Sequence, residues 1–128
     1  MNARSKEVSL PSPQSSVGGM VESVVGCKWS MVVLAQIRAG VVRPGAIERA
    51  VPGLSKKVLN ERLRKLQRFG IVERTVYPEV PPRVEYRMTA FGRRFGRLID
   101  EVQALQSKLD SAKRAKPTDV PVAGSARG

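Results

Sequence analysis

The stretch that decides the fold runs from Leu54 to Arg87: LSKKVLNERLRKLQRFG at 54–70, IVERTVY at 71–77, PEVPP at 78–82 and RVEYR at 83–87. In its first part, leucines recur at helical spacing on one face and basic residues occupy the other. Two segments with alternating side chains follow, separated by prolines that cannot donate hydrogen bonds to a β-ladder. The stretch predicts a cationic amphipathic helix followed directly by a β-hairpin with a stiff tip.

The sequence also predicts where this helix begins and ends. Ser55 is placed as its N-cap, where the hydroxyl can accept a hydrogen bond from a free amide of the first turn. Leu59, Leu63 and Leu66 fall on one face at about 100° per residue. Gly70 is expected to end the helix in a left-handed conformation.

The second strand of the hairpin is predicted to alternate between two faces. One face carries Val84, Tyr86 and Met88, and the other carries Arg83, Glu85 and Arg87. We therefore expect these two sets of side chains to point to opposite sides of the hairpin.

The rest of the chain predicts shorter helices between two tails. Helices are expected over 17–25, 28–39 and 45–50, and Thr89 is placed as the N-cap of a last helix that reaches about residue 111. Residues 1–16 and 112–128 carry too few apolar groups to pack, so both tails are predicted to be disordered. The expected fold class is mainly α with a small antiparallel β-wing, in one domain at 17–111.

The charge of the chain points to a polyanionic partner. The formal net charge is +12 over 128 residues. Residues 28–97 carry 16 Lys and Arg against 5 Asp and Glu, so nearly all the excess lies in the predicted domain. Basic tails would give the opposite distribution. We therefore expect the folded domain itself to bind nucleic acid.

The sequence disfavours several other function classes. Histidine is absent, and no phosphate loop or carboxylate pair occurs at a usable spacing, so we expect no enzyme, no metal site and no cofactor. No run approaches the roughly 18 apolar residues of a membrane span, and the N-terminus has no signal pattern. A single cysteine cannot form an internal disulfide, which fits a cytoplasmic protein.

A cationic helix followed by a proline-tipped flap is typical of a winged helix-turn-helix domain bound to double-stranded DNA. Asn60 can pair with an adenine edge, and Arg64 with guanine or a phosphate. The wing-tip arginine can reach the minor groove or a phosphate. The predicted DNA-binding residues are Arg43, Ser55, Lys56, Lys57, Asn60, Arg64, Arg68 and Arg83. The alternatives are a solvated surface helix and, for the wing-tip arginine, a structural turn residue.

The last predicted helix carries an apolar seam at heptad spacing. Its members are Phe91, Phe95, Leu98, Val102 and Leu105. The seam favours a homodimer, because a two-fold pair of chains can bind two DNA half-sites. Packing of the seam on the chain's own N-terminal helix is the alternative.

Cys27 admits two interpretations. It can be a small packed residue at the junction of two helices, as most lone cysteines are. It can also be a thiol sensor, because Lys28 and the start of a helix would lower its pKa. The exposure of the thiol decides between them.

The chain resembles the HxlR-type family of bacterial winged-helix transcriptional regulators over about Val17 to Leu105. The family's Gly-Lys-Trp pattern corresponds to CKW at 27–29, and its Leu-Pro-Gly-Ile-Ser and Leu-x-x-Arg-Leu-x-x-Leu patterns correspond to 51–55 and 59–66. The wing at 70–86, followed by Thr89 and Gly92, is the most specific part. The resemblance implies N- and C-terminal dimerisation helices, a homodimer on an inverted-repeat operator, and 55–64 as the recognition helix beside a wing at 78–83.

Two positions depart from the family's pattern. Many members carry a sensor cysteine twelve residues before the lysine of the second helix, where this chain has Ser16, and Cys27 stands where glycine is usual. Redox sensing at the usual position is therefore not implied. The family usually has Arg-Phe where this chain has Arg43-Pro44, which alters how the short helix packs.

These observations predict a cytoplasmic, nucleoid-associated regulator that binds DNA sequence-specifically. A non-specific architectural protein would use the same basic residues, and a winged-helix module that binds proteins is a second alternative. The ratio of operator to competitor affinity tests the first alternative, and salt-dependent duplex binding tests the second. The sequence names neither a small-molecule nor a redox effector.

Overall fold

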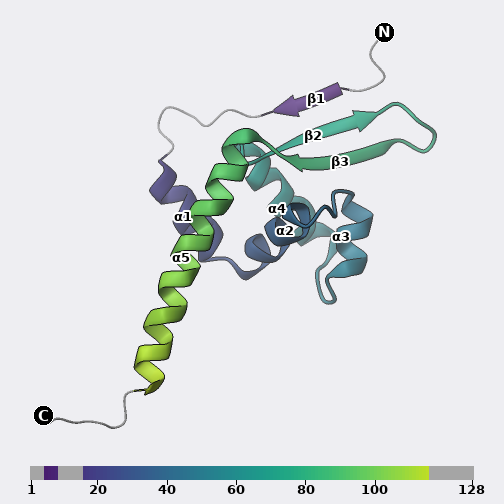
Figure 1. The fold of residues 1–128 in the computed structure, drawn as a ribbon. Coiled ribbons are helices and arrows are strands. Elements are labelled where there is room, and N and C mark those ends of the chain that lie inside the picture. The colour runs from purple at the N-terminus through teal and green to yellow at the C-terminus, as the bar shows by residue number, and fades with distance from the viewer. Residues whose placement is uncertain (1–4, 9–15, 116–128) are drawn as a thin grey trace, which may run out of the picture. The chain divides into compact units, whose positions relative to one another are not determined.

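The computed structural model describes residues 5–8 and 16–115. The chain divides into two compact units, Met1–Phe95 and Gly96–Gly128, with the boundary inside the last helix. In chain order the elements are β1 (Ser5–Val8), α1 (Val17–Val25), α2 (Lys28–Arg38), α3 (Pro44–Ala50), α4 (Lys56–Arg68), β2 (Val72–Tyr77), β3 (Arg83–Met88) and α5 (Ala90–Ala115) (Figure 1).

Helix α2 is the centre of the first unit, because it contacts α1, α3, α4 and β3. Its side chains Leu34 and Val33 are at most 1% exposed. Across from it, Leu59, Leu63 and Leu66 of α4 are equally buried, so the predicted apolar face of this helix is confirmed. The core therefore holds α4 by one face and leaves its other face to solvent.

The predicted ends of α4 are confirmed as well. The Oγ of Ser55 accepts a hydrogen bond from the amide of Val58 at 3.1 Å, which satisfies one free donor of the first turn. At the other end, Gly70 has a φ of 75°, a left-handed conformation that strains any residue with a Cβ. The chain can therefore leave the helix and enter β2 within a few residues.

Strands β2 and β3 form the predicted antiparallel hairpin, with Val72 opposite Met88 and Tyr77 opposite Arg83. The connection at 78–82 contains the three prolines. On the outer side of β3, the amide of Tyr86 donates to the carbonyl oxygen of Val42 at 2.8 Å. The wing is therefore attached to the segment that leads into α3.

The N-terminal tail differs in part from its prediction. Residues Ser5–Val8, expected to be disordered, form β1 and pair antiparallel with β2, so the sheet has the order β1-β2-β3 (Figure 1). The pairing satisfies backbone groups of β2 that an edge strand would leave open. The remainder of the predicted N-terminal tail before Ser16, and residues 116–128, lie outside the described residues.

Thr89 joins the hairpin to α5 as the predicted N-cap. Its Oγ1 donates to the carbonyl oxygen of Gly70 at 2.6 Å and accepts from the amide of Gly92 at 2.8 Å. A Cβ at Gly92 would lie 1.9 Å from the carbonyl oxygen of Ile71, so only glycine fits this contact. The start of α5 is thereby fixed against the start of β2.

The arrangement of α2, α3, α4 and the hairpin is the predicted winged helix-turn-helix fold. Helix α5 extends four residues beyond the predicted end near residue 111 and closes at Ala115. Among the described residues, no single helix has the length and apolar character to cross a membrane. Helices α1 and α2 pass that test only when taken together, across a bend of 101°.

Candidate DNA-binding surface

The solvent face of α4 brings together most of the predicted DNA-binding residues. Lys56, Lys57, Asn60, Arg64 and Arg68 are all exposed on it. The buried leucines on the opposite side fix the rotation of the helix, so Lys57, Asn60, Arg64 and Arg68 must face outward, whereas Lys56 is exposed as the first residue of the helix. Ser55 contributes through its cap, which orders the first turn that carries the two lysines.

Not every cation of α4 belongs to this face. The Nζ of Lys65 donates to the carbonyl oxygen of Ser23 in α1 at 3.0 Å. Burial lowers the pKa of Lys65, although the nearby Cys27 acts in the opposite direction. Arg62 is also partly buried, and its Nη1 lies 3.7 Å from Oε1 of Glu61. These two residues support the fold on the inner side of the helix, and neither was among the predicted DNA-binding residues.

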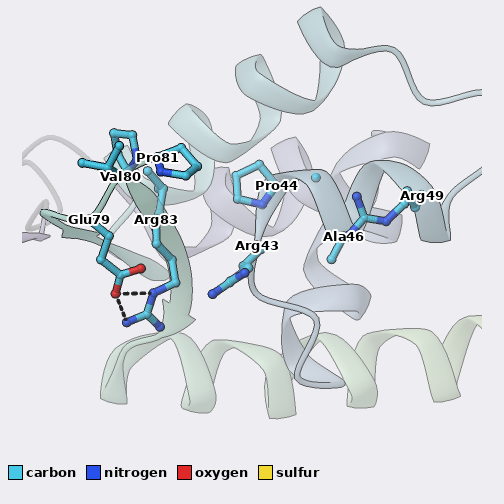
Figure 2. A pocket seen from close by; sticks show the side chains of 11 residues that line it. Arg43, Pro44, Ala46, Arg49, Glu79, Val80, Pro81 and Arg83 are labelled. Carbon is cyan, nitrogen blue, oxygen red and sulfur yellow. Dashed lines mark hydrogen bonds and ion pairs between the residues drawn. The ribbon is translucent and has the colours of Figure 1, made fainter.

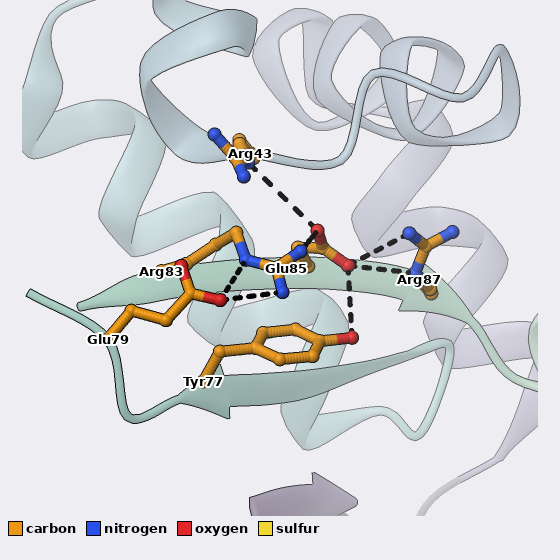
Figure 3. Close-up of polar contacts among 6 residues, drawn as sticks. All are labelled: Arg43, Tyr77, Glu79, Arg83, Glu85 and Arg87. Carbon is orange, nitrogen blue, oxygen red and sulfur yellow. Dashed lines mark hydrogen bonds and ion pairs between the residues drawn. The ribbon is translucent and has the colours of Figure 1, made fainter. Parts of the chain in front are cut away.

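Arg83 lies inside a set of contacts within the wing. Its Nη2 is 2.9 Å from Oε2 of Glu79, its Nη1 is 2.7 Å from Oε2 of Glu85, and its guanidinium carbon lies 3.6 Å from the ring centre of Tyr77 (Figure 3). The hydrogen bond with Glu79 is the main reason that the pKa of Arg83 is raised. The side chain is 27% exposed. Arg83 is thus the first residue of β3 and takes part in contacts within the wing, and its contact with DNA stays a prediction.

The centre of this cluster is Glu85, which the sequence assigned to one face together with two arginines. The residue is only 5% exposed. Nη2 of Arg87 donates to its Oε1 at 2.8 Å, and Nε of Arg43 lies 4.0 Å from its Oε2 (Figure 3). Burial by itself raises the pKa of Glu85, but the hydrogen bonds and charges of Arg87 and Arg83 outweigh it, so the net pKa is lowered.

Arg43 connects this cluster to α3, because it is the N-cap residue of that helix. Its side chain is 58% exposed, so it can contact Glu85 and still face solvent. A hollow of about 490 Å³ lies between the start of α3 and the wing tip. Figure 2 shows Pro44 and Arg49 on its α3 side and Val80 and Pro81 on its wing side. Pro44, which stands where the family usually has an aromatic residue, therefore lines this hollow.

A second hollow, of about 360 Å³, lies between α4 and the wing strands. We call it the α4–wing hollow, and its lining residues are Asn60, Arg64, Gln67, Arg74 and Tyr86. Only the first two were predicted as site residues. The other three were missed because nothing in their spacing shows that the two strands lie beside the recognition helix.

Cys27 occupies the N-cap position of α2 and is partly exposed. The pKa of its thiol is lowered to about 7. The largest cause is the side-chain hydroxyl of Ser30, which can donate to the thiolate because its buried Oγ makes no other hydrogen bond within the described part of the chain; burial opposes this effect, and the charges of Lys65 and Arg62 add to the lowering. Ser16, at the family's usual sensor position, caps α1 by accepting from the amide of Gly19 at 2.9 Å.

The predicted dimerisation residues do not share one environment. Phe95 is 3% exposed within the chain, and its ring centre lies 6.3 Å from that of the half-buried Phe91. Further along α5, Leu98 and Leu105 are 39% and 66% exposed, and Val102 is half-buried. The exposed part of the seam thus lies in the second half of the predicted residues.

Comparison with known proteins gives consistent results. A model of the HxlR-like helix-turn-helix family matches residues 24–113. The chain is 53% identical over 66 residues to the uncharacterized HTH-type transcriptional regulator sll1512 of Synechocystis. This match covers 52% of this chain and 49% of that protein. It is 31% identical over 100 residues to the uncharacterized HTH-type transcriptional regulator YdeP of Bacillus subtilis. This match covers 73% of this chain and 78% of that protein.

Solved structures agree with the sequence matches. The crystal structure of diamide-treated YodB from B. subtilis is similar with a TM-score of 0.65 at 30% identity, over 76% of this chain and 96% of that chain. The match with sll1512, by contrast, spans about half of that protein's length.

Proposed function

The chain belongs to the HxlR-like helix-turn-helix family, and from this premise we propose that it is a transcriptional regulator that binds double-stranded DNA sequence-specifically. The observation that carries the proposal is the exposed face of α4, where lysines and arginines surround Asn60 beside a β-wing. In a helix-turn-helix domain this helix enters the major groove and its N-terminal residues meet the base edges. The place of action is then the cytoplasmic nucleoid.

Affinity and selectivity come from different side chains in this proposal. The lysines and arginines of α4 replace counterions along the phosphate backbone, which gives affinity for any duplex. Asn60 can form two hydrogen bonds with an adenine edge, and Lys56 and Lys57 can reach guanine from the first turn. The hydrogen-bonded cap at Ser55 supports this role, because it holds that turn in place.

We propose further that two chains bind an inverted repeat as a homodimer. The exposed apolar side chains of α5 support this, since Leu98, Leu105 and Leu109 are 39%, 66% and 51% exposed. Leucines at such spacing on one helix gain stability by packing against a second copy. Two-fold pairing places two recognition helices on half-sites about one helical turn of DNA apart.

The experiment is selection of bound sequences from a random duplex pool, followed by affinity measurement at one fixed salt concentration. The expected result is a two-fold symmetric site that binds at least a hundredfold more tightly than a random duplex. An Asn60→Ala variant is expected to lose at least tenfold of that preference, whereas Glu22→Gln, on the exposed side of α1, should lose none. Sedimentation of the protein without DNA measures its molecular mass in solution and so tests whether it is a dimer.

A non-specific architectural protein is the second candidate, and the net charge of +12 favours it as well. The same selection distinguishes the two functions, because an architectural protein would enrich no sequence. A ratio of selected to random affinity near one would therefore replace the regulator by this alternative.

A further inference from the structure

The α4–wing hollow has the chemistry of an anion site. Its two arginines come from two elements, Arg64 from α4 and Arg74 from β2. Asn60, Gln67 and Tyr86 line the remainder. Arginine guanidinium presents several N–H donors in one plane, a geometry that matches two oxygens of a phosphate. The hollow lies wholly within the first unit of the chain.

The residues that line the α4 side of the hollow continue the exposed face of the recognition helix. Asn60, Arg64 and Gln67 are four and three residues apart, so they follow one another along a single face. Lys57 precedes them by three residues on the same face. A ligand in the major groove at the start of α4 would therefore extend toward the hollow as it follows the helix.

The position of Arg74 decides which part of DNA can reach the hollow. A helix in the major groove touches base edges at the groove floor, and a wing beside it covers the backbone that bounds the groove. A group that contacts both α4 and a wing strand must lie between them, at the edge of the groove. The chemical group at that edge is a phosphodiester.

We infer that the α4–wing hollow holds one backbone phosphate in each half-site, between the guanidinium groups of Arg64 and Arg74. The inference rests on the proposed function and assigns Arg64 to the backbone instead of to guanine. Arg64 then contributes affinity for every duplex, and base selection falls to Lys56, Lys57 and Asn60. Arg74, which lies outside the predicted recognition helix, becomes part of the DNA-binding surface.

The first test measures binding of Arg64→Ala and Arg74→Ala variants to the selected site and to a random duplex. Each variant is expected to weaken both by the same factor, about tenfold, and to reduce the slope of log affinity against log salt by about 0.9 for each phosphate that it no longer neutralises. The double variant should weaken binding by clearly less than a hundredfold, because both arginines hold one phosphate. Arg94→Ala, an exposed arginine at the start of α5, is the matched control and should change neither affinity by more than twofold.

The second test leaves the protein intact and changes the DNA. Neutral methylphosphonate linkages replace the phosphates of the selected site one at a time. One position in each half-site is expected to weaken the parent protein about tenfold and to have little effect on the Arg64→Ala and Arg74→Ala variants. The position of the sensitive phosphate is found with the parent protein alone, so it can be measured even where a variant at Arg74 loses stability.

Failure of the inference differs from failure of the proposed function. If Arg64→Ala reduces the preference for the selected site, Arg64 contacts a base and the inference is wrong, although the regulator proposal stands. If Arg74→Ala and Arg94→Ala bind both duplexes as the parent does, the hollow is not part of the surface. If the parent prefers no sequence, the regulator proposal is wrong, yet the paired effects on random duplex still test the phosphate site.

Discussion

Replacing Glu85 with glutamine should destabilise the protein by about 2 kcal/mol at pH 7. The carboxylate is 5% exposed and accepts hydrogen bonds from Arg83 at 2.7 Å and from Arg87 at 2.8 Å. Glutamine has nearly the same shape but no charge, and its amide nitrogen is a donor that faces other donors. The substitution therefore removes the charge that holds Arg43, Arg83 and Arg87 near one another.

The magnitude follows from the exposure of the partners. Hydrogen bonds to charged groups contribute about 1.5–3 kcal/mol each where both groups are buried. The side chains of Arg43 and Arg87 are 58% and 56% exposed, so solvent screens a large part of these interactions. We therefore assign about 2 kcal/mol to the whole cluster, near the lower end of the range for one buried bond. For a domain of this size the melting temperature should fall by roughly 8–12 °C.

The pH dependence has a definite sign. The folded-state pKa of Glu85 lies below its ordinary value of 4.5, so folding favours the ionised form. The stabilisation is fully present above that ordinary value and is lost as the pH falls through the folded-state pKa. The difference in melting temperature between the parent and Glu85→Gln should stay constant from pH 8 to about 5 and shrink below it.

Thermal unfolding followed by circular dichroism measures both effects. Glu22→Gln serves as the control, because this glutamate lies on the exposed side of α1 and its replacement should shift the melting temperature by less than about 2 °C. The reasoning fails if Glu85→Gln melts within 2 °C of the parent at pH 7. It fails equally if the difference between the two proteins persists unchanged at pH 3.

Three further predictions concern other parts of the first unit. Gly92→Ala should lower the free energy of unfolding by about 2–3 kcal/mol in urea titrations, because the new Cβ would overlap the carbonyl oxygen of Ile71; an unchanged midpoint would contradict this. Ser55→Ala should cost about 1 kcal/mol in the same titration and weaken the selected site more than random duplex, since the cap orders the first turn of α4. Alkylation of Cys27 by iodoacetamide should rise with pH around a midpoint near 7, and Lys65→Gln should move that midpoint upward; a midpoint near 9 in the parent would argue against the thiolate environment.

Local patterns in the sequence were sufficient to predict most of the fold. The cap at Ser55, the leucine face of α4 and the left-handed Gly70 each depend on residues within one or two turns, so their sequence signals are complete. Thr89 was placed as an N-cap for the same reason. Strand β1 was missed because its stability comes from an edge of β2 more than sixty residues away, and its own composition resembles that of a tail.

The candidate surface was predictable along α4 and less so where elements meet. Periodicity shows which α4 side chains point outward, and Lys57, Asn60, Arg64 and Arg68 lie on that side, while Lys56 is exposed in the first turn of the helix. It carries no information on what stands beside the helix. The sequence therefore does not show that Gln67, Arg74 and Tyr86 line one hollow with Asn60 and Arg64.

Glu85 shows most clearly why alternation alone cannot describe the wing. A period of two assigns a side chain to one face of a strand, but burial depends on what covers that face. Here the cover consists of Arg83 and Arg87 from the same strand and Arg43 from the start of α3, forty-two residues earlier. A lone acidic residue flanked by two arginines at i−2 and i+2 was the available signal. It indicates an ion-paired cluster that fixes the wing relative to α3, so Arg83 supports the surface before it can contact DNA.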